Sequence, residues 1–231
     1  ILLMACLVEK KARQPIIFVL IGIFLSVFAS EVNAYLRNIL PMSTFEITII
    51  VTPISEEILK ALPILFFATV LAPKKEALFT ASMAVGIGFA VLENAYYLLN
   101  DASFNMIDAI VRAFGAGLMH GMCTLLVGVG ISFVKKKRKL FAVGTFGLLS
   151  TAIVYHGIYN ILIQAEFSIV GALLPIATYI PFFIWRLKEN CVWAMRSITA
   201  FRGALNRRPS SWPSAAPFRQ LSCWLSASWA F

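Results

Sequence analysis

Apolar residues follow one another in long runs with almost no polar interruption. Six such runs are visible in the chain, at about 15–36, 44–72, 76–99, 106–134, 140–165 and 168–186. Each has close to the ~20 residues that a helix needs to cross the hydrocarbon core of a bilayer. The apolar residues 1–8, ILLMACLV, are too few for a span, and we expect them to be the end of a truncated first one. The pattern predicts an all-α, polytopic transmembrane helix bundle of about seven spans.

Basic and non-basic breaks between the runs alternate along the chain. Every second break is basic, whereas the other breaks hold only Arg37 among basic residues. The basic breaks contain Lys10, Lys11 and Arg13; Lys74 and Lys75; KKKRK at 135–139; and Arg186 and Lys188. Because basic loops stay in the cytoplasm, this alternation predicts the orientation of every span.

The composition excludes several classes of protein. Hydrophobic residues make up 60% of the 231 residues and charged residues only 13%, with a mean hydropathy of +0.83. Soluble domains are nearer 45–50% and 25%, so a soluble enzyme, a disordered chain and a disulfide scaffold are excluded. The net charge of +9 would suggest nucleic-acid binding in a soluble protein, but membrane topology explains the basic breaks. We therefore expect membrane lipid and no nucleic acid as a partner.

The chain divides into two parts of different composition. We expect a transmembrane domain over residues 1–190, with its core at 44–165. Residues 191–231 are rich in Pro, Ser and Trp and lack a helical period. We interpret them as a cytoplasmic or surface-lying tail, or as sequence foreign to the rest of the chain, such as a frameshifted end.

Ionisable residues inside the predicted spans carry most of the functional information. A charge at the bilayer centre costs about 2.5–3.5 kcal/mol on insertion scales, so such groups indicate a function by default. Counted from the outer ends of four different spans, these groups reach similar middle-to-outer depths. We therefore expect one shared polar cavity, lined by Glu56, Glu57, Lys60, Glu93, Arg112, His120 and His156.

Helical spacing predicts how some of these side chains pair. Lys60 lies one turn below Glu56 on the same face, so the two are expected to form an ion pair. Glu56 and Glu57 lie about 100° apart around the helix, so only one can point straight at the cavity centre. Arg112 is expected to pair with Glu93.

Absent motifs narrow the chemistry. The chain has no HExxH zinc helix, and its two aspartates, Asp101 and Asp108, lie in or beside one outer loop. The remaining carboxylates and histidines suit the activation of water. A proton- or ion-coupled transporter that uses the intramembrane carboxylates is the main alternative, and a membrane scaffold is another.

Four of these patterns resemble the PrsW-type intramembrane protease family, which is related to CAAX-prenyl and bacteriocin-processing proteases. They are EExxK at EEILK, FxxxE at Phe89–Glu93, His120 within a span, and HxxYN at His156. The resemblance covers about residues 44–165, and Glu93 stands where the wider superfamily usually has His.

The resemblance implies proteolysis of a single-pass, membrane-anchored protein such as an anti-sigma factor, in a bacterial inner (cytoplasmic) membrane. It implies catalytic roles for Glu56, Glu57 and His156, with His120 and Glu93.

Two mechanisms are consistent with these residues. In the first, Glu56 or Glu57 activates water, His156 and Asn160 bind water or the oxyanion, and His120 and Glu93 complete the lining. In the second, Zn²⁺ is held by Glu93, His120 and His156, with water in an open position.

Overall fold

The chain folds into helices, in a computed structural model that describes residues 10–100, 106–132, 138–165, 167, 169–181, 183, 184 and 188. It divides into two compact units, Ile1–Ile180 and Pro181–Phe231. All the elements discussed below belong to the first unit. They are α2 (Lys10–Ile39), α3 (Thr44–Glu46), η1 (Ile47–Val51), α4 (Thr52–Phe66), η2 (Phe67–Leu71), α5 (Lys75–Asn100), α6 (Met106–Ile131) and α7 (Arg138–Gln164).

The observed helices follow the predicted apolar runs closely. Four are long and apolar enough to cross a membrane: Ala12–Ile39, Lys75–Asn100, Ala109–Ile131 and Val143–Gln164. The run at 44–72 forms α3, η1, α4 and η2 without a break, and Ile169–Pro181 is a shorter apolar helix. The all-α transmembrane class is thus confirmed. The count of seven spans stays a prediction, and the truncated first span and the tail beyond 190 lie outside the described residues.

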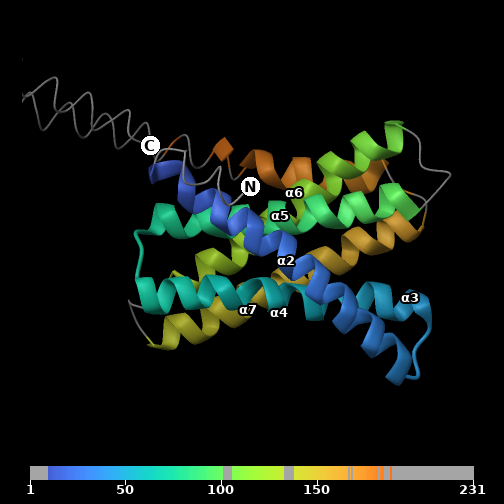
Figure 1. The fold of residues 1–231 in the computed structure, drawn as a ribbon, viewed down its shortest axis with the longest axis horizontal. Coiled ribbons are helices and arrows are strands. Elements are labelled where there is room, and N and C mark those ends of the chain that lie inside the picture. Colours follow the sequence, from blue (N-terminus) through green and yellow to red (C-terminus); the bar gives the residue numbers. More distant parts are fainter. Residues whose placement is uncertain are drawn as a thin grey trace, which may run out of the picture. The chain divides into compact units, whose positions relative to one another are not determined.

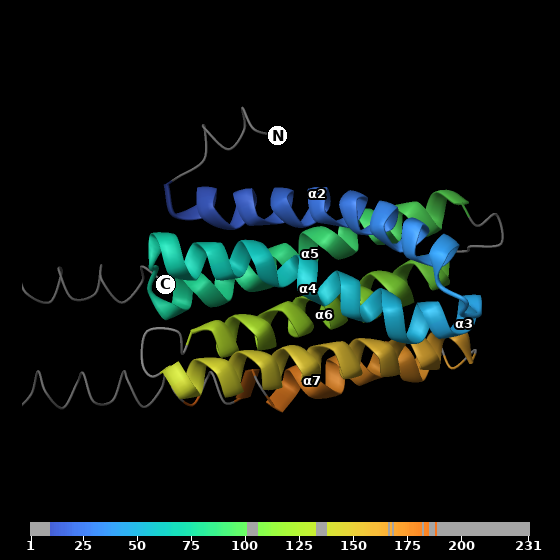
Figure 2. The same cartoon turned by 90° about the horizontal axis from the view of Figure 1, so that it is seen from below.

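Helix α4 lies among the other long helices of the unit (Figures 1 and 2). α2 packs along α5, α5 along α6 and α6 along α7, while α4 contacts all four. Glycines permit the closest approaches: a Cβ at Gly86 would overlap the backbone carbonyl of His120, and one at Gly88 that of Val19. α5 is therefore held directly against both α2 and α6.

The backbone just before α4 is irregular, and Pro53 explains part of this. Pro53 has no N–H, so the carbonyl of Ile49 has no α-helical partner. One residue earlier, the N–H of Thr52 bonds to the Ile47 carbonyl, five residues back, as in a π-helix. The carbonyl of Thr48 is therefore also free to bind another group. Irregular backbone of this kind is tolerated at membrane depth where it lines a cavity or is buried in protein.

Candidate active site

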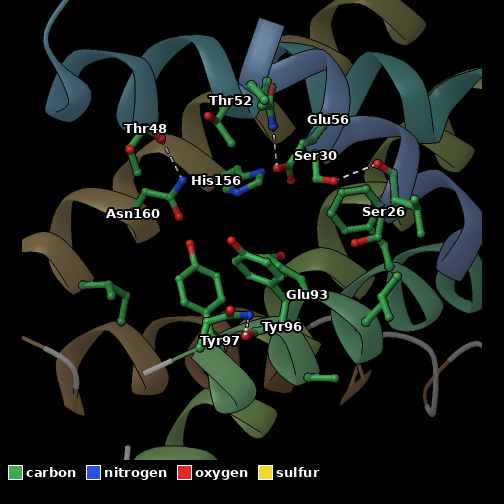
Figure 3. A pocket seen from close by; sticks show the side chains of 18 of the residues that line it. Ser26, Ser30, Thr48, Thr52, Glu56, Glu93, Tyr96, Tyr97, His156 and Asn160 are labelled. Atoms are coloured by element: carbon green, nitrogen blue, oxygen red, sulfur yellow. Dashed lines mark hydrogen bonds between the residues drawn. The ribbon is translucent and has the colours of Figure 1, made fainter. Parts of the chain in front are cut away.

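A cavity of about 700 Å³ lies at one end of the bundle. Its walls come from the C-terminal halves of α2, α5 and α7, the N-terminal part of α6, and η1 with the start of α4. Figure 3 shows polar side chains from these elements around one space. The predicted basic, cytoplasmic breaks are at the other ends of these helices, so the cavity lies on the predicted outer side. Among its lining residues are Ser30, Asn33, Thr48, Glu56, Glu93, Arg112, His156 and Asn160.

The adjacent carboxylates Glu56 and Glu57 have different surroundings. Glu56 lines the cavity, where its Oε1 accepts a hydrogen bond from Asn33 Nδ2 at 3.2 Å and its Oε2 has no hydrogen-bond partner. Glu57 is fully buried behind the wall. Its Oε1 lies 2.6 Å from Lys60 Nζ and 2.9 Å from His156 Nδ1. Of the two, Glu56 is the carboxylate that faces the cavity.

Lys60 pairs with Glu56, as the sequence predicts, but Glu57 is its closer partner. Lys60 Nζ lies 4.0 Å from Glu56 Oε2 but 2.6 Å from Glu57 Oε1. The reason is a second acceptor: the ammonium group also lies 2.8 Å from His120 Nδ1, and it sits 4.4 Å from the Phe89 ring centroid. Lys60 is fully buried and bridges Glu57 to His120.

Glu93 pairs with Arg112, as the sequence predicts. Arg112 donates to Glu93 Oε1 at 3.0 Å, and its guanidinium carbon lies 3.6 Å from the Tyr97 ring centroid. The other oxygen, Oε2, is 2.6 Å from His120 Nε2, although the two atoms are not aligned as a hydrogen bond. Contacts thus connect His156, Glu57, Lys60, His120 and Glu93 in series, from α7 through α4 and α6 to α5.

His156 and Asn160 lie on the same face of α7 and both line the cavity. Asn160 Nδ2 donates to the Thr48 carbonyl at 2.9 Å, the carbonyl that η1 leaves free (Figure 3). The His156 ring meets the His120 ring edge to face, with centroids 4.9 Å apart. His120 itself is fully buried and lies behind the cavity wall.

Helix α2 contributes to the site, which the sequence reasoning missed. Asn33 binds Glu56 and accepts a hydrogen bond from the Ser55 hydroxyl, so it bridges α2 to α4. Ser26, Ser30 and Arg37 line the same cavity. The spacing of 26, 30, 33 and 37 places these polar residues on one helical face, and this stripe in an apolar run was the available signal.

Three of the described residues could hold a metal ion: Glu56, His120 and His156. Their ligand atoms lie within 4.8 Å of one another. Glu56 replaces the predicted Glu93, whose carboxylate is held by Arg112 and His120. One carboxylate and two imidazoles suit zinc, and Glu57 supports His156 from behind as carboxylates do at zinc sites.

The three candidate ligands do not fit a metal ion equally well. Glu56 Oε2 has no hydrogen-bond partner, and the Nδ1 of His156 is bound to Glu57, which leaves Nε2 for a ligand role. His120 instead has an ammonium at Nδ1 and a carboxylate oxygen at Nε2. Glu56 and His156 are arranged as ligands, whereas the contacts of His120 would have to change.

Comparison with known families identifies the chain. Residues 10–186 match the PrsW family, which is described as a family of intramembrane metalloproteases. Neither the curated proteins nor the solved structures contain a match. The matched segment holds all the site residues named above, and the described helices are those of a membrane protein. The chain therefore belongs to the PrsW family of intramembrane proteases and is a peptidase.

Proposed function

We propose that the chain hydrolyses a peptide bond of a single-pass membrane protein inside this cavity, with the carboxylate of Glu56 as the base. The observation that carries the proposal is the position of that carboxylate. Glu56 Oε2 has no hydrogen-bond partner and lies 4.0 Å from Lys60 Nζ. The residue is 94% buried and stands at the wall of a cavity large enough for peptide and water. A carboxylate held in this way can accept a proton from water in a site that excludes bulk solvent.

The proposed reaction proceeds as follows. Glu56 takes a proton from water as the oxygen attacks the scissile carbonyl carbon. The carbonyl oxygen becomes an oxyanion, to which Asn160 donates: its amide has two N–H groups, and only one is used by Thr48. The C–N bond then breaks, and the proton held by Glu56 passes to the leaving nitrogen. The products are a new carboxylic acid and a new amine.

A metal-assisted version is the second candidate, because the family is described as metalloproteases and Glu56, His120 and His156 are close together. A bound zinc ion would supply a water of lowered pKa and polarise the carbonyl. Metal analysis of the purified protein, with cleavage measured before and after chelation, separates the two versions. We expect a rigorously metal-free sample to keep its activity, and loss of activity that zinc restores would establish the second version.

The distribution of buried polar groups favours a peptidase over a transporter. A transporter needs polar groups along a continuous path, whereas the buried charged groups of the described residues cluster at the cavity end. The other half of the bundle is lined by Ile64, Phe67, Leu78, Val127 and Ile131. The buried Ser82 and Thr124 there bond to backbone carbonyls of their own helices.

One assay separates protease, transporter and scaffold. Purified protein in liposomes is mixed with single-pass reporters whose outer juxtamembrane segment is randomised, and new amino termini are identified by mass spectrometry. We expect wild type to cleave on the outer side and Glu56→Gln to lose most activity. Equal cleavage by both proteins, or none by either, would reject the proposal. The outer side follows from the predicted topology, and the inner (cytoplasmic) membrane of a bacterial cell is the location we propose.

A further inference from the structure

We infer that the buried Glu57–Lys60 ion pair holds the two histidines of the site in opposite neutral tautomers. His156 carries its proton on Nδ1 and presents a bare Nε2, whereas His120 carries its proton on Nε2 and has a bare Nδ1. The inference concerns the folded protein, and only its consequence for catalysis rests on the proposed function.

The carboxylate of Glu57 determines the tautomer of His156. Oε1 of Glu57 lies 2.9 Å from His156 Nδ1 and accepts from Lys60 Nζ at 2.6 Å. An ionised carboxylate has no hydrogen to donate, so Nδ1 of His156 must be the donor. The second nitrogen of the neutral ring, Nε2, then has a lone pair.

The ammonium of Lys60 determines the tautomer of His120 in the reverse sense. Lys60 Nζ lies 2.8 Å from His120 Nδ1, and an ammonium group only donates, so Nδ1 accepts. The proton of the neutral ring is therefore on Nε2. That atom lies 2.6 Å from Glu93 Oε2, but the two are not aligned as a hydrogen bond, so the assignment rests on Lys60.

Because all four residues are buried, the wrong tautomer in either ring would cost free energy. Glu57, Lys60 and His120 are 0% exposed and His156 is 2% exposed, so solvent cannot compensate for a mismatched contact. The other tautomer of His156 would place a lone pair against a carboxylate, and that of His120 would place an N–H against an ammonium. An unsatisfied buried polar group costs about 1–3 kcal/mol, and more when it is charged.

The two histidines then have different tasks in the proposed reaction. A bare Nε2 makes His156 an acceptor, suited to hold the attacking water in line with Glu56 or to bind a metal ion. It cannot donate to the oxyanion, so Asn160 takes that role alone. His120 accepts from Lys60 and packs edge to face against the His156 ring, and Glu57 and Lys60 are positioning residues.

The test exploits the small number of histidines, since the whole chain has only two. Protein purified without a histidine tag and labelled with ¹⁵N in its imidazole rings is reconstituted in lipid, and its metal content is measured alongside. Protonated and bare ring nitrogens are resolved by ¹⁵N NMR, and His156→Gln assigns the signals. We expect Nδ1–H with a bare Nε2 for His156, and the reverse for His120. The same tautomer in both rings, a mixture in either, or a doubly protonated ring would overturn the inference.

Two variants give a sharper readout because each should affect one ring only. In Glu57→Leu the acceptor for Nδ1 is removed, so His156 should lose its preference for Nδ1–H while His120, still bound by Lys60, keeps its own tautomer. In Lys60→Met the preference of His120 should be lost while His156 keeps Nδ1–H. Glu46→Gln, at an exposed carboxylate, should alter neither ring. If either site variant changes both rings or neither, the pair does not act as we infer; if a variant fails to fold, the wild-type spectrum decides.

Activity measurements separate this inference from the proposed function. We expect Glu57→Leu to lower kcat about 10²–10⁴-fold with little change in KM, since His156 loses the partner that fixes its orientation and its tautomer. Opposite tautomers in a protein that cleaves none of the reporters would support the inference while rejecting the proposed function. Cleavage by a protein with two identical tautomers would support the proposed function and overturn the inference.

Discussion

Two successive turns of helix α4, one toward the cavity end of the bundle and one toward the other end, are buried to the same degree by opposite means. Lys60 and Ile64 lie one turn apart and both are 0% exposed. Lys60 is surrounded by Glu57, His120 and the Phe89 ring, whereas Ile64 belongs to the apolar core of the bundle.

The difference shows that burial alone does not distinguish the site from the scaffold. At the cavity end, each charged group depends on a specific partner, and removal of one partner leaves another charge unpaired. At the other end, close packing is shared among many apolar contacts and no single atom is required. Variants at the two ends should therefore separate activity from stability.

The largest effect is expected at the charged end, from Lys60→Met. This variant removes the cation and leaves the Glu57 carboxylate buried, which should lower the free energy of unfolding by about 3–5 kcal/mol. Chemical unfolding in detergent micelles measures the change. Combining Lys60→Met with Glu57→Leu removes both charges and should restore most of the stability without activity. If Lys60→Met were as stable as wild type, the Glu57–Lys60 pair would not be needed for the stability of the cavity end.

A similar or smaller loss is expected at the apolar end, from Ile64→Ala. Truncation of a fully buried side chain should cost about 2–5 kcal/mol through lost contacts and a cavity. The folded fraction should retain the kcat of wild type, since no site residue loses a partner. A kcat that falls tenfold in fully folded protein would contradict the separation of the two ends.

Gly157→Ala tests how closely α7 must approach η1. A Cβ at Gly157 would lie 2.8 Å from the Ile49 carbonyl oxygen, so α7 must move and carry His156 with it. A small displacement of a site residue can cost up to about 100-fold in rate. Gly147→Ala on the same helix meets nothing within 4 Å and should stabilise the protein by about 0.5–1 kcal/mol. Equal kcat values for the two variants would show that the α7–η1 contact does not position His156.

The smallest effect is expected from Asn33→Ala in α2. Loss of the hydrogen bond to Glu56 Oε1 should lower kcat about tenfold, because the carboxylate is less well oriented. The matched control is Ser30→Ala, since the Ser30 hydroxyl bonds only to the Val27 carbonyl. We expect the control to be within twofold of wild type. If both variants behave alike, α2 is merely a wall of the cavity.

Much of the fold was predictable because lipid imposes simple rules. A spanning helix must be long and apolar, so the runs in the sequence coincide with the helices of the structure within a few residues. The Arg112–Glu93 pair was predictable for a similar reason, since two opposite charges at membrane depth have few other partners.

The details of the site were less predictable because they depend on contacts between helices. Spacing along α4 predicted that Lys60 can pair with Glu56, but not the closer contacts that Lys60 makes with Glu57 and with His120 on α6. The place of Glu56 in the possible metal group depends on the same packing. The bond between Asn160 and Thr48 needs a π-helical turn, for which Pro53 was only an indirect signal.

The role of Glu56 as the base is the central claim, and one comparison tests it most directly. Wild type, Glu56→Gln and Glu46→Gln are reconstituted at equal folded amounts with a reporter that wild type cleaves, and single-turnover rates are measured. We predict a fall of about 10²–10⁴-fold for Glu56→Gln and a rate within twofold of wild type for Glu46→Gln. Cleavage by Glu56→Gln at the wild-type rate would contradict the account.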